Sequence, residues 1–484
     1  MSPGRPSRGP HSTHRREPAR PAGRGGPRGD AERRVDPARR AAYEAIAAVH
    51  RDDAYANIVL PRLLRENRIL GRDAAFATEL TYGTLRSQGQ LDAIIADAAG
   101  RPVERIDPPA RDALRIGAYQ LLHTRVPAHA AVSATVDLVR AVAPGVAGFT
   151  NAVMRRITEQ DLDAWLAEVA PSREEDPVGH LSVALAHPQW IVRAFSDALS
   201  GDLAQTERLL YANNERPDVH LCARPGRVDA ADLADEVGGA PGAFSPYAVY
   251  LPSGAPGDLR AIVDGRAHVQ DEGSQLVALA LTGVDVGEDG GRWLDLCAGP
   301  GGKAALLGSV AVERNAHVTA VEVAPHRADL VSQAVRGLPV EVLCADGRQI
   351  GGRELDEESF DRVLVDAPCT GLGSLRRRPE SRWRRQPSDL PPLTGLQREL
   401  LGAALRLVRP GGVVAYVTCS PHLVETQVSV TEASRRSRVP VELIDAREHL
   451  PAGMPGLGTG PTVQLWPHRH GTDAMFLALL RRTP

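Results

Sequence analysis

The chain has 484 residues, of which 43% are hydrophobic and 24% charged, so it is long enough for two to four globular domains of ordinary composition. A net charge of -3 gives no global attraction for nucleic acid, although binding depends on where charges lie rather than on their sum. The five cysteines have no metal-like spacing and are too few for a disulfide scaffold, which argues against zinc and against secretion. No apolar run could span a bilayer and no secretory signal is present, so we expect a cytoplasmic protein without membrane contact or a metal site.

The N-terminal segment differs in composition from the rest of the chain. Residues 1–35 are dominated by Pro, Gly, Arg and Ser and cannot bury enough apolar surface to fold. We therefore predict a disordered tail over residues 1–35. The tail is either a solubilising segment or a contact for RNA phosphates.

Two domains are predicted after the tail. Apolar residues at intervals of three and four predict an all-helical domain over residues 36–170, with helices in 40–49, 74–85, 90–98, 109–122, 128–142 and 150–157. A small α+β domain is predicted over residues 171–281, because an amphipathic helix ending at Leu199 is followed by short strands at 219–223 and 248–251.

Residues 282–484 alternate apolar strands with helices, which predicts a parallel sheet covered by helices on both faces. The expected strands are 293–297, 318–323, 340–344, 362–366, 413–418, 441–444 and 475–480. The fold class is therefore multidomain, with an all-α domain, a small α+β domain and a C-terminal α/β domain.

A glycine-rich turn follows the first strand of this α/β domain. Its sequence, Ala298-Gly-Pro-Gly-Gly-Lys303, fits neither the P-loop nor the dinucleotide fingerprint, but it lets the backbone approach a ligand closely. The next two strands end near Glu322 and Asp346, where carboxylates can accept ribose hydroxyls and an adenine amino group. Each feature alone is a common turn residue, and together they predict an adenosine-containing ligand. Lys303 is also the sole lysine of the sequence.

Two cysteines follow the next pair of strands, in Asp366-Ala-Pro-Cys369 and Thr418-Cys419-Ser420. Both strand ends open onto one crevice in a doubly wound sheet, so these residues should converge. A thiolate that adds to carbon 6 of cytosine activates carbon 5 toward a methyl donor. The reaction needs a nucleophile, a hydrogen bond at ring nitrogen 3 and a base, and Asp366, Cys369 and Cys419 can supply these three roles. The alternative, that cysteines are small buried hydrophobes, is retained for Cys297 and Cys344 within strands.

These motifs resemble the RsmB/Sun family of bacterial 16S ribosomal RNA cytosine-C5 methyltransferases, and the resemblance covers all but the tail. It implies a Rossmann-like class I domain that uses S-adenosylmethionine. Cys419 would be the nucleophile that forms a covalent adduct at carbon 6, Cys369 would assist proton removal and product release, and Asp366 would lie near the methyl group and the ring. The implied cofactor-binding residues are Cys297, Ala298, Gly299, Pro300, Gly301, Gly302, Lys303, Glu322, Asp346 and Asp366.

Other segments extend the resemblance. Residues 114–122, 126–132 and 150–156 are similar to the NusB fold, which implies RNA binding; a dimerisation or docking bundle is the alternative. The basic segment resembles the family's substrate loop, and its predicted RNA contacts are Arg376, Arg377, Arg378, Arg382 and Trp383. A solvated charged face is the alternative there.

Residues 270–275 and 471–476 are similar to further family segments, with Ala474 and Met475 as departures. Of a paired glutamate that often follows the second cysteine, only Glu425 is present.

Four functions remain open. The first is a ribosomal RNA methyltransferase that acts as a monomer, and the second is the same chemistry on transfer or messenger RNA. The third is an inactive RNA-binding or antitermination-like factor, which would predict erosion at Cys419 or the glycine loop, and neither is eroded. The fourth is a small-molecule methyltransferase, against which the basic segment argues.

Overall fold

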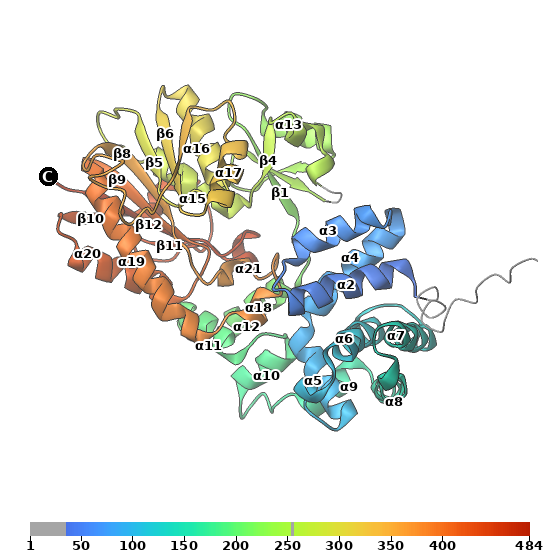
Figure 1. Ribbon diagram of the computed structural model, residues 1–484. Coiled ribbons are helices and arrows are strands. Elements are labelled where there is room, and N and C mark those ends of the chain that lie inside the picture. Colours follow the sequence, from blue (N-terminus) through green and yellow to red (C-terminus); the bar gives the residue numbers. More distant parts are fainter. Residues whose placement is uncertain (1–34, 253–255) are drawn as a thin grey trace, which may run out of the picture.

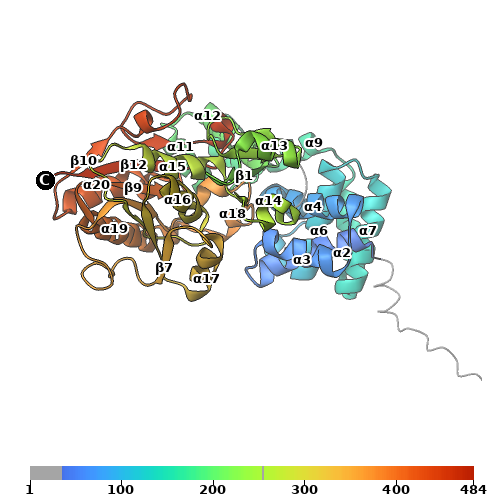
Figure 2. The same ribbon diagram turned by 90° about the horizontal axis from the view of Figure 1, so that it is seen from above.

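The computed structural model describes residues 35–252 and 256–484, so the predicted tail lies outside the described residues except for Val35 (Figures 1 and 2). Val35, which the prediction placed in the tail, is buried in the core of the helical domain. None of the helices in these ranges combines the length and the hydropathy that a membrane span requires.

The N-terminal domain is all-helical, as predicted. Its helices are α2 (Pro37–Arg51), α3 (Ala56–Glu66), α4 (Gly71–Arg86), α5 (Gln88–Ala99), α6 (Pro108–His123), α7 (Ala128–Val142), α8 (Ala147–Ile157) and α9 (Leu162–Val169). The Asp36 carboxylate caps α2 by accepting a hydrogen bond from the Arg39 amide at 2.9 Å, and Pro37 fits the first helical position. Two helices were not expected from periodicity: α3, which contains Pro61, and α9, which has only 8 residues.

Three helices connect this domain to the rest of the chain: α10 (Pro177–Ala184), α11 (Gln189–Ala198) and α12 (Leu203–Asn214). Their apolar faces pack on Leu372, Leu375 and Trp466 of the C-terminal domain, with which they share one core cluster. Although they lie in the middle of the sequence, these helices therefore support the loops of the C-terminal domain.

The small sheet follows, with antiparallel strands in the order β2-β3-β1-β4. Its elements are β1 (Val219–Ala223), α13 (Ala230–Val237), β2 (Ala240–Pro241), β3 (Ala248–Leu251), α14 (Arg260–Val263) and β4 (Ala267–Val269). β1 and β3 match the two predicted strands. The next helix, α15 (Glu272–Gly283), packs against β1 on one side and the large sheet on the other, so the two units share a core.

The large sheet has the order β10-β12-β9-β8-β5-β6-β7, with β11 paired to β12. Its strands are β5 (Arg292–Asp295), β6 (His317–Glu322), β7 (Val340–Cys344), β8 (Phe360–Asp366), β9 (Val408–Thr418), β10 (Val441–Ile444), β11 (Val463–Gln464) and β12 (Phe476–Arg482). The strands from β5 to β9 are parallel, but β12 runs antiparallel to both β9 and β10. The prediction of a parallel sheet is wrong at this edge, because hydrophobic alternation identifies a strand but not its direction.

Helices cover both faces of this sheet, as predicted (Figure 1). α15 and α16 (Gly302–Glu313) pack on one face, while α19 (Leu390–Leu407) and α20 (Gln427–Arg436) pack on the other. Along β8 the side chains alternate between these two cores, with Leu364 on the first face and Val363 and Val365 on the second. The remaining helices are α17 (Pro325–Ala334), α18 (Ser381–Arg384) and α21 (Pro467–His470).

Candidate active site

Cys369 and Cys419 meet at the carboxyl edge of the large sheet. β8 and β9 are parallel neighbours, and Asp366 at the end of β8 pairs with Val417 near the end of β9. The two loops therefore leave the sheet side by side, and the Sγ atoms of Cys369 and Cys419 lie 3.4 Å apart without forming a disulfide. The hydrogen bond to Cys419 and burial hold the pKa of the Cys369 thiol well above its usual value, so Cys369 carries a proton that it can donate to Cys419.

Lys303 and Asp366 form an ion pair beside these thiols, with 2.7 Å between Nζ and Oδ2. Burial lowers the pKa of Lys303, but the nearby Asp366 carboxylate and the Cys419 thiol raise it, and the net shift is upward. The lysine is therefore an ammonium at neutral pH. It holds the Asp366 carboxylate next to the sulfur pair.

Asp295 is a further acidic group in this cluster that the sequence interpretation missed. It ends β5 directly before the glycine loop and is completely buried. Burial, together with the neighbouring Asp366, raises its pKa to about 7. Its position at a strand end, as for Glu322, was the signal that could have identified it.

Glu425 connects the two cysteine loops. Its carboxylate is fully buried and accepts hydrogen bonds from the Thr370 amide at 2.8 Å, from the Thr370 hydroxyl and from Gln397 Nε2 at 3.1 Å. Gln397, on α19, also donates to the carbonyl of Pro368 at 2.9 Å. Since Thr370 follows Cys369 directly, Glu425 determines where that loop lies.

The glycine loop passes over the ends of β5 and β6. The Gly299 amide donates to Glu322 Oε2 at 3.1 Å, and a Cβ on Gly299 would lie 2.2 Å from the same oxygen. Gly301 has a φ of 113°, and a Cβ there would lie 2.7 Å from Cβ of Ala334. Glycine is therefore required at Gly299 by the nearby Glu322 carboxylate, and at Gly301 by the positive φ and the close approach of α17.

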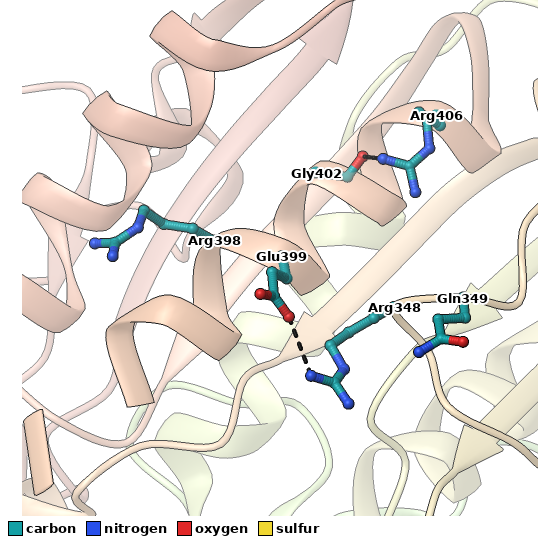
Figure 3. A pocket seen from close by; sticks show the side chains of 6 residues that line it. All are labelled: Arg348, Gln349, Arg398, Glu399, Gly402 and Arg406. Carbon is teal, nitrogen blue, oxygen red and sulfur yellow. Dashed lines mark hydrogen bonds and ion pairs between the residues drawn. The ribbon is translucent and has the colours of Figure 1, made fainter. Parts of the chain in front are cut away.

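Asp346 lies after β7, where Arg348 chelates it with a shortest contact of 2.6 Å. The hydrogen bond from Arg348 lowers the pKa of Asp346, which is therefore ionised. Arg348 also contacts Glu399 at 3.1 Å, across a hollow of about 390 Å³ (Figure 3). This hollow is lined by Arg348, Gln349, Arg398, Glu399, Gly402 and Arg406, and by neither thiol.

The two remaining cysteines of the large sheet lie in different environments. Cys297 is in the glycine-loop region, where burial raises the pKa of its thiol. Cys344 is exposed, which corrects the interpretation that it is buried, because β7 is the edge strand of the sheet.

The basic segment makes many contacts within the protein, and its five predicted RNA contacts remain a prediction. Arg376 and Arg377 both bind the carboxylates of Asp271 and Asp473, at 2.7 to 3.0 Å. Arg382 is fully buried and bonded to backbone carbonyls, and the Trp383 indole packs on Gly89. These groups are engaged inside the protein. Arg378 alone among the five is exposed.

Comparisons with known proteins bear on this site. The model of the family described as 16S rRNA methyltransferase RsmB/F matches residues 285–481, and the model of the NusB family matches residues 36–159. The chain is similar to ribosomal RNA small subunit methyltransferase B of Escherichia coli, with 34% identity over 78% of this chain and 85% of that protein. The chain belongs to the RsmB/F methyltransferase family.

Two further similarities span nearly the whole chain. A Mycobacterium tuberculosis protein named as a methyltransferase is 59% identical over 94% of this chain and 98% of its own length. The solved structure of PH0851 superimposes with a TM-score of 0.77 at 23% identity, covering 93% of this chain and 99% of that one, which shows a common fold. The helical domain of this family member is thus a NusB-type domain, and the C-terminal domain is a Rossmann-like methyltransferase domain.

S-adenosylmethionine is the methyl donor of this family, and the residues present here fit it. The glycine loop leaves no room for side chains where the backbone approaches Glu322. The Glu322 and Asp346 carboxylates lie at successive strand ends, as an adenosine requires. When bound, the donor supplies an electrophilic methyl group.

Proposed function

We propose that this protein methylates carbon 5 of a cytosine in 16S ribosomal RNA through a covalent bond between Cys419 and carbon 6. The observation that carries the proposal is the pair of thiols 3.4 Å apart at the ends of adjacent strands, beside the Lys303–Asp366 ion pair. The family description and the name of the E. coli relative support the ribosomal substrate. With this substrate the protein acts in the cytoplasm, as a monomer.

We assign separate roles in this reaction to three residues and to the lysine that holds one of them. The Cys419 sulfur adds to carbon 6, which makes carbon 5 nucleophilic enough to take the methyl group. As the sulfur adds, ring nitrogen 3 takes up a proton, and the Asp366 carboxylate, held by Lys303, accepts a hydrogen bond from that N–H. Cys369, beside the new bond, assists the release step, in which a base takes the carbon 5 proton, the bond between carbon 6 and sulfur breaks and its electron pair returns to Cys419.

Variants of the two cysteines test this assignment. We expect Cys419→Ala to abolish methyl transfer and Cys369→Ala to accumulate a covalent RNA adduct on a denaturing gel, because attack is intact while release is blocked. Cys344→Ala is the matched control, since Cys344 is exposed and outside the site, and it should retain the wild-type rate. An active Cys419→Ala variant, or adducts from Cys419→Ala instead of Cys369→Ala, would overturn the assignment.

Bisulfite sequencing of total RNA from cells with and without the gene tests the substrate. Loss of one protected cytosine in 16S ribosomal RNA supports the proposal. Loss at a transfer RNA position keeps the chemistry and replaces the substrate. No change in any RNA contradicts both and favours an inactive RNA-binding factor.

A further inference from the structure

The basic segment connects the helical domain to the catalytic domain. We call residues 376–385 the arginine strap; its helix α18 lies between the two domains in both views (Figures 1 and 2). Arg382 is completely buried, and its guanidinium donates to the carbonyls of Arg86 at 2.9 Å and Asn213 at 2.8 Å. Arg86 ends α4 of the helical domain, while Asn213 is on α12. One side chain thus joins three parts of the molecule.

Neighbouring residues of the strap extend this contact. Arg384 donates to the carbonyl of Val49 at 2.8 Å, and Glu380 accepts the Ala56 amide at 3.3 Å. The Trp383 indole lies so close to α5 that a Cβ on Gly89 would be 2.3 Å from the ring. The strap is therefore fitted against α2, α3, α4 and α5 of the helical domain.

The ends of the strap attach to the catalytic loops. Arg385 Nε donates to the carbonyl of Thr370 at 3.0 Å, and Thr370 follows Cys369 in the chain. At the other end, Arg376 and Arg377 bind Asp473 and Asp271. A movement of the helical domain relative to the strap is thereby transmitted to the loop that carries Cys369.

Arg382 is suited to this coupling because its acceptors are neutral. Its partners are carbonyl and amide oxygens rather than a carboxylate, and burial lowers its pKa to about 9. A cation without a buried counterion is stable inside a protein only while several dipoles surround it. Three of these dipoles come from Ala186, Asn213 and Asn214 around the linking helices, and the fourth is the Arg86 carbonyl of α4, so the set is complete only when the helical domain is docked.

We propose that docking of the helical domain positions the Cys369 and Cys419 loops through the arginine strap, with Arg382 as the positioning residue. RNA held by the helical domain would then lie at a fixed place relative to the two thiols. Only this last step rests on the proposed function.

The test compares full-length wild type with Arg382→Met, Arg382→Lys and the control Arg193→Met. Arg193 is exposed on α11, and its guanidinium bonds Gln189 in the same helix. The rate of iodoacetamide alkylation is measured at each cysteine by peptide mass spectrometry. We expect Arg382→Met to raise the rates at Cys369 and Cys419 by about tenfold, which equals about 1.4 kcal/mol of easier opening. The alkylation rates of Arg382→Lys should lie between those of wild type and Arg382→Met. The rates of Arg193→Met should match those of wild type.

Two further readouts separate positioning from loss of folding. Cys222 is fully buried in the small sheet, so its alkylation should stay slow in Arg382→Met. The affinity for S-adenosylhomocysteine should remain within about twofold, while kcat on RNA falls by about tenfold. Unchanged rates at Cys369 and Cys419 would overturn the inference, and so would a parallel rise at Cys222. If wild type methylates no RNA, the proposed function fails, and the alkylation rates still decide this inference.

Discussion

Lys303, Asp366 and Asp295 form a small charge cluster in which one cation faces two carboxyl groups. Lys303 pairs with Asp366 at 2.7 Å, which leaves Asp295 buried with one carboxylate oxygen that accepts no hydrogen bond from the described residues. Burial is the larger cause of the raised pKa of Asp295, and the neighbouring Asp366 raises it further. Asp295 is completely buried, so its charged form is poorly solvated.

This arrangement makes the stability of the protein depend on pH. The pKa of Asp295 is about 7 in the folded state against an ordinary value of 3.8, so its contribution to stability is complete below about pH 4 and is lost as pH rises to about 7. The Asp295→Asn variant has no carboxyl group to ionise at this position, so it does not lose this stability as pH rises. We expect the variant to exceed wild type by about 2–4 kcal/mol in unfolding free energy at pH 8, and to equal it near pH 4, in urea titrations. A constant difference across this pH range would contradict the assignment.

At the scale of elements, the active site depends on how three segments are joined rather than on any one of them. The loops after β8 and β9 and the helix α19 meet at Glu425, which accepts from Thr370 and Gln397. Glu425→Ala leaves buried donors without acceptors, so we expect a loss of about 2 kcal/mol or more in stability and slower methylation. Thermal unfolding and initial rates measure both.

Glu432→Ala provides the control for this variant. Glu432 forms ion pairs with Arg398 and Arg436 near the surface, which contribute about 0–1 kcal/mol. A Glu425→Ala protein as stable and active as Glu432→Ala would show that the Glu425 carboxylate does not hold the loops after β8 and β9.

The sequence predicted these elements well where their pattern is local. All seven expected strands of the large sheet were found, and Cys369 and Cys419 were expected to converge because both follow parallel strands. The direction of β12 was not predictable, since a strand has the same alternation either way. The burial of Arg382 was also missed, because arginine patterns do not reveal that carbonyls from α4 and α12 surround the side chain.

At the scale of the whole molecule, segments that are distant in sequence pack against one another. The linking helices α10 to α12 share a core with Leu372 and Leu375 beside the Cys369 loop. The helical domain contacts α10 as well as the strap, since Gln90 Nε2 donates to the carbonyl of Ala184 at 2.7 Å. The covalent connection between the two domains, in contrast, is a short exposed segment at residues 171–175.

We call the contacts of the helical domain with the strap and the linking helices the seam. Cutting the covalent connection tests whether the seam alone holds the two parts together. A protease site placed between Ser172 and Glu175 interrupts exposed residues and leaves the contacts of Arg382, Trp383 and Arg384 intact. A covalent link gives the domains an effective concentration in the millimolar range, so a weak seam would open once the link is cut. We expect the two cut fragments to co-elute in gel filtration at about 10 µM, because the seam contains the buried Arg382 guanidinium, which donates to carbonyls on both sides, and the Trp383 ring packed on Gly89.

The Arg382→Met variant, cut in the same way, should separate into two fragments. Truncating this side chain leaves the carbonyls of Arg86 and Asn213 facing each other across the seam without a donor. Each buried acceptor left unpaired costs about 1–3 kcal/mol, and a loss of 2.8 kcal/mol weakens association about 100-fold. Cut wild type that separates would mean that the linker, rather than the strap, keeps the NusB-type domain beside the thiols.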